Sequence, residues 1–250
     1  MRGVLALLLL VTAAPCPALA AEGTPEPEAL IEWRDWATAA LDQPPADIQP
    51  LPAFSERLRE LIAERRTEGT GLEPLERDDG LERAADAHAV DMLRRDFMAH
   101  ESPEGLGPGA RVALLARQFG GIVGENLAEH EGLDADQIEA QLGPLALKIA
   151  DGFMASPGHR ENILRPDYTH EAIGTFVQGE RLVVVHMFGA RSILLEQPVE
   201  FEQAGGSDLE LRAAAGNDLV GYAYRAHGQP VEELVVLEPS STEIVVDPGL

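Results

Sequence analysis

The stretch from Ser156 to Leu164 constrains the local structure of this chain more than any other segment does. Ser156 is a good helix cap, and Pro157 suits the first helical position, whose N–H has no partner within a helix. Pro166 disfavours helix just before it, so we expect a short helix that ends there. His159 then lies in its first turn, where the helix dipole favours a neutral imidazole that can bind a metal ion or accept a proton.

The first twenty residues have the pattern of a secretory signal peptide. Arg2 precedes an apolar run from Val4 to Val11, and Ala18-Leu19-Ala20 supplies the small residues of a cleavage site. We expect cleavage after Ala20, which also removes Cys16, the only cysteine of the chain. The apolar run is shorter than the roughly 20 residues that span a bilayer, so we expect no membrane insertion. The sequence therefore predicts an exported protein, periplasmic or extracellular, without thiol or disulfide chemistry.

The charge of the chain restricts its partners. The sequence has 43 acidic and 19 basic residues, which give a formal net charge of −24 at pH 7. Such a surface repels nucleic acid and anionic membranes. We therefore expect no nucleic-acid partner, and a small ligand or a cell-envelope component instead.

Four segments are expected along the chain. After the signal peptide (1–20), residues 21–52 are interpreted as a linker with one short helix from Ala29 to Leu41. Residues 53–190 form the main domain, which mixes helices with a late β-hairpin around Gln178-Gly179-Glu180. Residues 191–250 alternate short β-like runs with turn residues, and this predicts a small β-rich appendage that could contact a protein partner.

Of two histidines in this region, one lies within a predicted helix that begins near Asp79-Gly80 and the other follows it. His88 lies on the apolar stripe of this helix, so we interpret it as a packing residue. His100 lies in the Gly- and Pro-rich loop that follows, and loops on a rigid frame commonly carry polar chemistry. A further helix is expected from Arg111 to Phe119, ended by Gly120-Gly121.

Three short motifs occur in order along the main domain: Met98 to Gly105, Gly124-Glu125-Asn126-Leu127-Ala128, and Ser156 to Leu164. Together they resemble the bacterial branch of the CAP superfamily, which is named for cysteine-rich secretory proteins, antigen 5 and plant pathogenesis-related 1. The resemblance covers roughly Ser55 to Ala190. It implies an α+β fold, a CAP-type α-β-α sandwich, to which this chain adds the small C-terminal all-β appendage.

The resemblance also implies a ligand-binding cleft. His100 matches the family's first cleft histidine, Glu125 its first glutamate and His159 its second histidine. In several relatives the two histidines bind a divalent cation such as zinc, so His100 and His159 are the candidate metal ligands. The family's second glutamate has no match on the helix before His159. We expect supporting roles for the polar neighbours within the motifs: Asn126, Ser156 and Asn162.

The residues alone leave three functions open. The first is ligand binding, in which the cleft holds a lipid, a glycan, an envelope fragment or a divalent cation. The second is a metal-dependent hydrolase in which Glu125 is the base for a bound water. The third is a structural or interaction protein in which the C-terminal appendage mediates protein contacts and the cleft is vestigial. Nucleophilic catalysis by cysteine or by a Gly-x-Ser-x-Gly serine is excluded, because the mature chain has neither.

Overall fold

The computed structural model describes residues 27–195, 211–215, 221–224, 233–236 and 243–246. The predicted signal peptide, with Cys16 and Ala20, lies outside these residues. The helices are α1 (Pro27–Asp42), α2 (Pro52–Thr67), α3 (Asp79–Arg95), α4 (Pro108–Leu115), α5 (Ala135–Ala140), α6 (Leu142–Ala155) and α7 (Pro157–Ile163). The strands are β1 (Ile48–Pro50), β2 (Glu76–Arg77), β3 (Phe119–Glu131), β4 (His170–Gln178), β5 (Arg181–Leu195), β6 (Leu211–Ala215), β7 (Gly221–Tyr224), β8 (Glu233–Val236) and β9 (Glu243–Val246).

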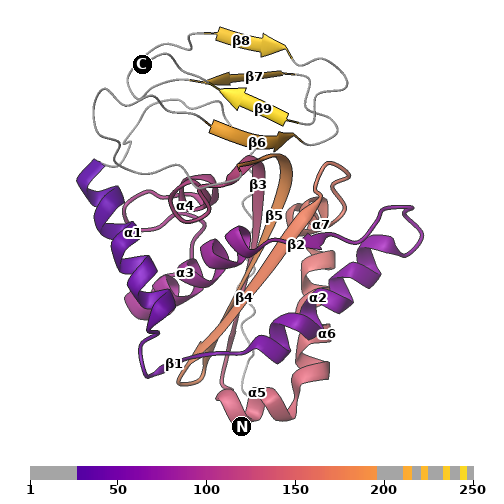
Figure 1. Cartoon of the computed structure of the whole chain (residues 1–250). Coiled ribbons are helices and arrows are strands. Elements are labelled where there is room, and N and C mark those ends of the chain that lie inside the picture. Colours follow the sequence, from indigo (N-terminus) through magenta and orange to yellow (C-terminus); the bar gives the residue numbers. More distant parts are fainter. Residues whose placement is uncertain (1–26, 196–210, 216–220, 225–232, 237–242, 247–250) are drawn as a thin grey trace.

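A mostly antiparallel sheet separates two layers of helices (Figure 1). Within the described residues this sheet has seven strands in the order β1-β4-β5-β6-β9, with β2 paired to β4 and β3 paired to β5. Helices α1, α3 and α4 cover one face, and α2, α5, α6 and α7 cover the other. Each face has its own apolar cluster, so burial on both sides holds the sheet in place. The predicted α-β-α sandwich is confirmed.

Several local predictions hold for identifiable reasons. Helix α3 starts at Asp79 because the Asp78 carboxylate accepts a hydrogen bond from Leu81 N at 3.0 Å. The β4–β5 hairpin closes over Gly179, whose φ of 58° is one that glycine adopts without strain. His88 is fully buried and its Nε2–H donates to the carbonyl of Ala99 at 2.8 Å, which confirms the packing role.

The expected linker is, from Pro27 onward, part of the folded domain. Trp33 is 4% exposed and its indole donates to Asp91 at 3.2 Å, so α1 packs on α3. Strand β1 pairs with β4, with Pro50 opposite Phe176. The boundary expected at residue 52 therefore lies next to a strand of the main sheet.

The helix expected from Arg111 to Phe119 is α4, which begins at Pro108 and ends at Leu115. The chain that follows is the long strand β3. Gly120-Gly121 lies within β3 at a shift in its register with β5. A Cβ atom on Gly121 would lie 2.0 Å from the carbonyl oxygen of Ala190, so only glycine fits this approach of the two strands. The glycines that suggested a break therefore permit close pairing.

The boundary expected at residue 191 falls inside β5, which continues to Leu195. Ile193 pairs with Ala215 of β6, and β6 pairs with β9, so these strands extend the main sheet. Strands β7 and β8 pair only with each other within the described residues. The rest of the predicted appendage lies outside the described residues.

A buried arginine joins α2 to the end of α7. Arg66 is 3% exposed. Its guanidinium donates to four backbone carbonyls, at distances of 2.7–3.1 Å: Glu73, Ile163, Arg165 and Tyr168. Arg66 thus neutralises the carbonyl end of the short helix that carries His159.

We expect Arg66→Lys to lower the free energy of unfolding by roughly 2–4 kcal/mol, because one ammonium cannot serve four diverging carbonyls. Urea denaturation followed by circular dichroism measures this change. Arg65→Lys is the matched control: Arg65 is partly exposed and, within the described part of the chain, pairs with Asp151 alone, so about 0.5 kcal/mol or less is expected. Equal losses in the two variants would contradict this role of Arg66.

Candidate functional site

The carboxylate of Glu125 organises one half of the site. Its Oε1 accepts a hydrogen bond from Nδ1 of His100 at 2.8 Å, and its Oε2 accepts one from Nη2 of Arg111 at 2.5 Å. The side chains of Glu125 and Arg111 are 1% and 0% exposed, whereas that of His100 is 30% exposed. Since Nδ1 of His100 is bound to the carboxylate, Nε2 is the nitrogen left for a ligand.

Two opposing effects act on the pKa of Glu125. Burial alone would raise it, but the positive charge of Arg111, together with His88 and His100, outweighs burial and lowers it to about 2. Glu125 is therefore a fixed anion at every physiological pH, with both oxygens engaged.

Arg111 also shapes the loop that carries His100. Its Nη1 donates to the carbonyls of His100, at 2.8 Å, and Leu106, at 2.6 Å. One guanidinium on α4 thus holds both the loop and its carboxylate partner. Arg111 was not among the candidate site residues predicted from the sequence. The available signal was its helical spacing from Leu114 and Leu115, which places it on the apolar side of α4.

His159 forms the other half of the site, on α7. It is 6% exposed and its ring meets that of Phe153 edge-on, with centroids 5.2 Å apart. Burial lowers its pKa to about 4, with smaller contributions from the neighbouring His100 and His186. The predicted neutral imidazole is confirmed, although burial rather than the helix dipole is the main cause. No described residue bonds to its ring, and its buried Nδ1 is unpaired.

The amide side chains fasten α7 to β3. The Nδ2 of Asn126 donates to the carbonyl of His159 at 3.0 Å. The Nδ2 of Asn162 donates to Oδ1 of Asn126 at 2.9 Å and to the carbonyl of Glu125 at 3.2 Å. Ser156 occupies the N-cap position of α7, but its buried hydroxyl makes no capping bond.

We call His100, Glu125, Asn126 and His159 the histidine site. Successive residues of a strand point to opposite faces, so Glu125 and Asn126 cannot share one. The register agrees: Glu125 is opposite Met187, which packs with α3, and Asn126 is opposite His186, whose ring lies 6.4 Å from that of Phe153 on α6. The histidine site therefore straddles β3.

A second buried histidine–carboxylate pair lies beside His159. Nε2 of His186 donates to Oε2 of Glu171 at 2.8 Å, and their side chains are 0% and 2% exposed. Neither His186 nor Glu171 was among the candidate site residues predicted from the sequence. Glu171 is the second residue of β4, a strand buried along nearly its whole length, and the sequence around it carries no signal for its partner.

The donors do not form a ready three-ligand metal site. Among the described residues, no group of three or more His, Cys, Asp or Glu side chains could hold a metal ion. The cause is the division by β3, because Glu125 is on the face opposite His159 and is already bound to Arg111. Catalytic zinc usually has three protein ligands, so the fit is poor. Zinc binding by His100 and His159 alone stays a prediction.

The fold and the histidine site define an α+β domain that presents two histidines around one strand of its sheet. The profile of the CAP family, described as the cysteine-rich secretory protein family, matches residues 57–188. The chain belongs to this family.

Individual relatives are more distant. The chain is 30% identical over 128 residues to the uncharacterized protein YkwD of Bacillus subtilis (strain 168), which covers 51% of this chain and 44% of YkwD. The chain thus spans less than half the length of that relative. An outer surface protein of Borrelia burgdorferi is 22% identical with a TM-score of 0.48, and the match covers 57% of this chain and 98% of that one. An extracellular SCP-domain protein of Bacillus anthracis str. Ames is 24% identical with a TM-score of 0.44, over 56% and 41% of the two chains.

We expect Arg111→Met to lower the free energy of unfolding by about 3–5 kcal/mol, because it leaves the Glu125 carboxylate buried and unpaired. Adding Glu125→Gln should recover part of that loss, since the second change removes the stranded charge. A double-mutant cycle by urea denaturation measures this coupling. Strictly additive losses would show that the two side chains do not depend on each other.

The buried histidines predict loss of stability in mild acid. The pKa values of His88 and His159 are lowered from 6.5 to about 4, chiefly by burial, so the unfolded chain takes up protons first as pH falls. The contribution of these two histidines to the free energy of unfolding is fully present above about pH 7 and is lost between about pH 6.5 and 4. The loss is up to about 3 kcal/mol for His88 and less for His159, which lies nearer the surface. Free energies of unfolding measured at half-unit pH steps should depend less on pH in this range for His88→Gln and for His159→Gln than for the wild type. Unchanged slopes would refute this assignment.

Proposed function

We propose that this protein is an exported CAP-domain binding protein whose histidine site holds a small ligand: a lipid, a glycan or another fragment of the cell envelope. One observation carries this proposal. His100 is oriented by a buried ion pair and keeps Nε2 for a ligand, while His159 stays neutral beside it without a partner of its own. Such imidazoles can donate a hydrogen bond to a hydroxyl, phosphate or carbonyl oxygen, or accept one from a hydroxyl group.

The exposure of the two rings supports an order of contact. His100 is partly exposed, whereas His159 is buried behind Phe153 and α7. A ligand therefore meets His100 first and reaches His159 around β3. The amide network of Asn126 and Asn162 keeps α7 against the strand during that contact.

The hydrolase alternative has less support. A general base needs a free oxygen and a pKa near the working pH. Both oxygens of Glu125 are engaged and its pKa is about 2, so this carboxylate is poorly suited to activate water. A cation held by His100 and His159 remains compatible with ligand binding, because water and the ligand would complete its coordination.

Export is supported by the sequence and by the family. The first twenty residues have the pattern of a signal peptide. The family whose profile matches residues 57–188 is described as one of secretory proteins. No helix in the described part of the chain is long and apolar enough to cross a bilayer. We further propose that the segment 191–250 contacts a protein partner, and that nucleic acid is not a partner because of the charge of −24.

We expect the purified protein to capture a component from a solubilised cell envelope, detected by native mass spectrometry. His100→Ala and His159→Ala should each reduce the captured fraction about tenfold, because each removes a polar contact in a partly buried site. His130→Ala is the matched control: His130 lies on the same strand as Glu125 but outside the site. If His100→Ala and His159→Ala capture the same component as fully as the wild type does, the proposal is wrong.

Zinc titration by calorimetry separates metal binding from plain ligand binding. If His100 and His159 hold the ion, zinc binds at pH 7.5, weakens at pH 5.5 and is lost in either alanine variant, because the ligands must be neutral. If the wild type and both variants bind zinc equally, His100 and His159 are not the zinc ligands. Ligand binding is then tested by the mass-spectrometry experiment alone.

A further inference from the structure

A gap in the outer edge of β4 lies two strands away from β3, across β5. Strand β1 pairs with β4 as far as Pro50 opposite Phe176, and one further backbone bond, from Leu51 to Thr175, follows before the chain enters α2. Strand β2 pairs with the other end of β4, at His170 and Glu171. Between these two short strands no described strand pairs with the outer edge of β4.

The backbone of Ile173 points into this gap. Along a strand, the backbone N–H and C=O groups of every second residue point towards the same edge, and two carbonyls show which residues of β4 point towards its outer edge. The carbonyl of Glu171 accepts from Asp78 N at 3.1 Å, and that of Thr175 accepts from Leu51 N at 2.9 Å. Ile173 lies midway between Glu171 and Thr175, so its N–H and C=O point towards the same edge. No described residue bonds to either group. The gap thus offers one donor and one acceptor at the spacing of a strand.

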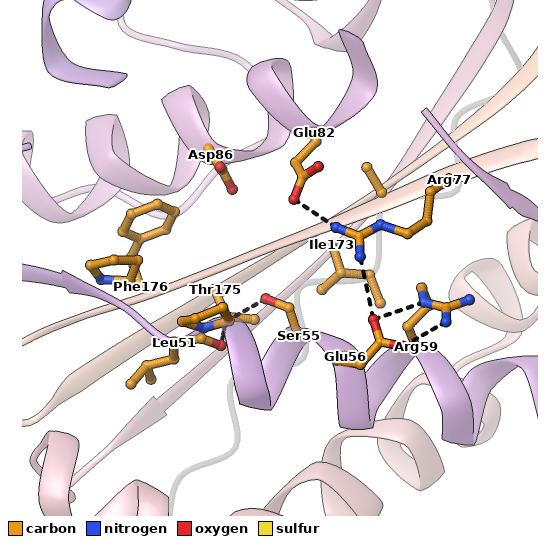
Figure 2. Close-up of a pocket in the computed structure, with 13 residues that line it drawn as sticks. Leu51, Ser55, Glu56, Arg59, Arg77, Glu82, Asp86, Ile173, Thr175 and Phe176 are labelled. Atoms are coloured by element: carbon orange, nitrogen blue, oxygen red, sulfur yellow. Dashed lines mark hydrogen bonds and ion pairs between the residues drawn. The ribbon is translucent and has the colours of Figure 1, made fainter. Parts of the chain in front are cut away.

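A pocket of about 360 Å³ occupies the same gap. Figure 2 shows it between α2 and α3, with Asp86 and Glu82 extending from α3 towards Ser55 and Glu56 of α2. Ile173 and Thr175 of β4 lie between the two helices. We call this the edge pocket. Its volume lies within the range of roughly 300–1,000 Å³ that is usual for small-ligand sites.

The charges of the edge pocket are paired except for one. Arg77 donates to Glu82 at 3.0 Å and to Glu56 at 3.5 Å, and Arg59 donates to Glu56 at 2.6 Å. Asp86 has no hydrogen bond or ion pair with any described residue. Its carboxylate lies against β4, because a Cβ atom on Gly174 would be 2.5 Å from Asp86 Oδ1. The unpaired carboxylate and the free backbone groups of Ile173 are therefore neighbours.

We propose that the edge pocket binds a small amide-bearing compound with a positively charged amino group. The amide completes the β-ladder at Ile173, and the ammonium pairs with Asp86. Apolar wall residues, including Leu51 and Phe176, cover the carbon chain that joins the two groups. A peptide of one or two residues with a basic side chain has this chemistry. The edge pocket is separate from the histidine site and does not depend on its function.

The protonation of Asp86 supports the same assignment. Burial, together with the nearby Glu82, raises the pKa of Asp86 to about 7, although Arg77 opposes the change. The charged groups that face it from α2, Glu56 and Arg59, are already paired with each other. Binding of a cation therefore favours the ionised form of Asp86, and affinity should increase as pH rises from about 6 to 8.

Three probes test the proposal by NMR titration of the ¹⁵N-labelled protein at pH 8. Nα-acetyl-lysine N-methylamide carries both groups, Nα-acetyl-norleucine N-methylamide lacks the charge, and hexylamine lacks the amide. We expect the lysine probe to bind about tenfold more tightly than either of the others and to shift the amide resonance of Ile173.

Asp86→Asn isolates the charge at nearly constant shape. It should bring the affinity for the lysine probe down to that for the norleucine probe and abolish the rise between pH 6 and 8. This variant removes a buried carboxylate, so its thermal midpoint at pH 8 should equal or exceed that of the wild type. Asp136→Asn, an exposed change in the first turn of α5, is the matched control and should leave binding unchanged.

The proposal is overturned if no probe binds, or if Asp86→Asn and Asp136→Asn bind the lysine probe equally. Binding that leaves the Ile173 amide unshifted would also overturn it, because the ligand would then lie elsewhere.

Discussion

The buried pair of Arg111 and Glu125 is the interaction on which the arrangement of the site depends. A buried ion pair is favourable only when the remaining polar atoms are also satisfied. Here Arg111 uses Nη1 for two carbonyls of the loop before α4, and Glu125 uses its second oxygen for His100, whereas the buried Nε of Arg111 has no hydrogen-bond partner among the described residues. The pair thus fixes a loop, a helix and a strand relative to one another. Its consequence is a histidine with one nitrogen committed and the other presented outward.

A second buried arginine has the corresponding role on the opposite face of the sheet. Arg66 holds the carbonyl end of α7, and Asn126 holds the carbonyl of His159 within the same helix. A helix of seven residues has little stability of its own, so these bonds, together with burial of Ile163, determine where His159 lies. The two histidines are therefore positioned from opposite faces by different arginines, and β3 is the element that both arrangements share.

The sequence predicted the helices around the motifs, the hairpin, the α-β-α sandwich and the candidate residues His100, Glu125 and His159. It missed β3, because Gly120, Gly121 and Gly124 suggest a loop when only the sequence is read. The structure needs two of them for close approach: a Cβ atom on Gly121 would lie 2.0 Å from the carbonyl oxygen of Ala190, and one on Gly124 would lie 2.2 Å from the hydroxyl of Tyr168. It also missed Arg66 and Arg111, since arginine is usually exposed and nothing local indicates a partner far away in the chain. The expectation of a shared cleft followed from the family resemblance, and nothing in the sequence indicated that Glu125 and Asn126 point to opposite faces of a strand.

Strand β4 connects the two sites through Glu171. The side chain of Glu171 bonds to His186, whose ring neighbours His159, while its carbonyl accepts from Asp78 at the margin of the edge pocket. The same residue thus touches both regions, one through its side chain and the other through its backbone. Its carbonyl bond belongs to the ladder with β2, which remains intact whether or not the gap at Ile173 is filled. A ligand that pairs with Ile173 would add to this ladder without displacing any bond of Glu171. The backbone geometry therefore favours independent occupation of the edge pocket and the histidine site. Within the described residues, two links join the regions: the charge of Glu171 acts on Arg59 and Arg66, and Ile173 pairs with His186 between β4 and β5.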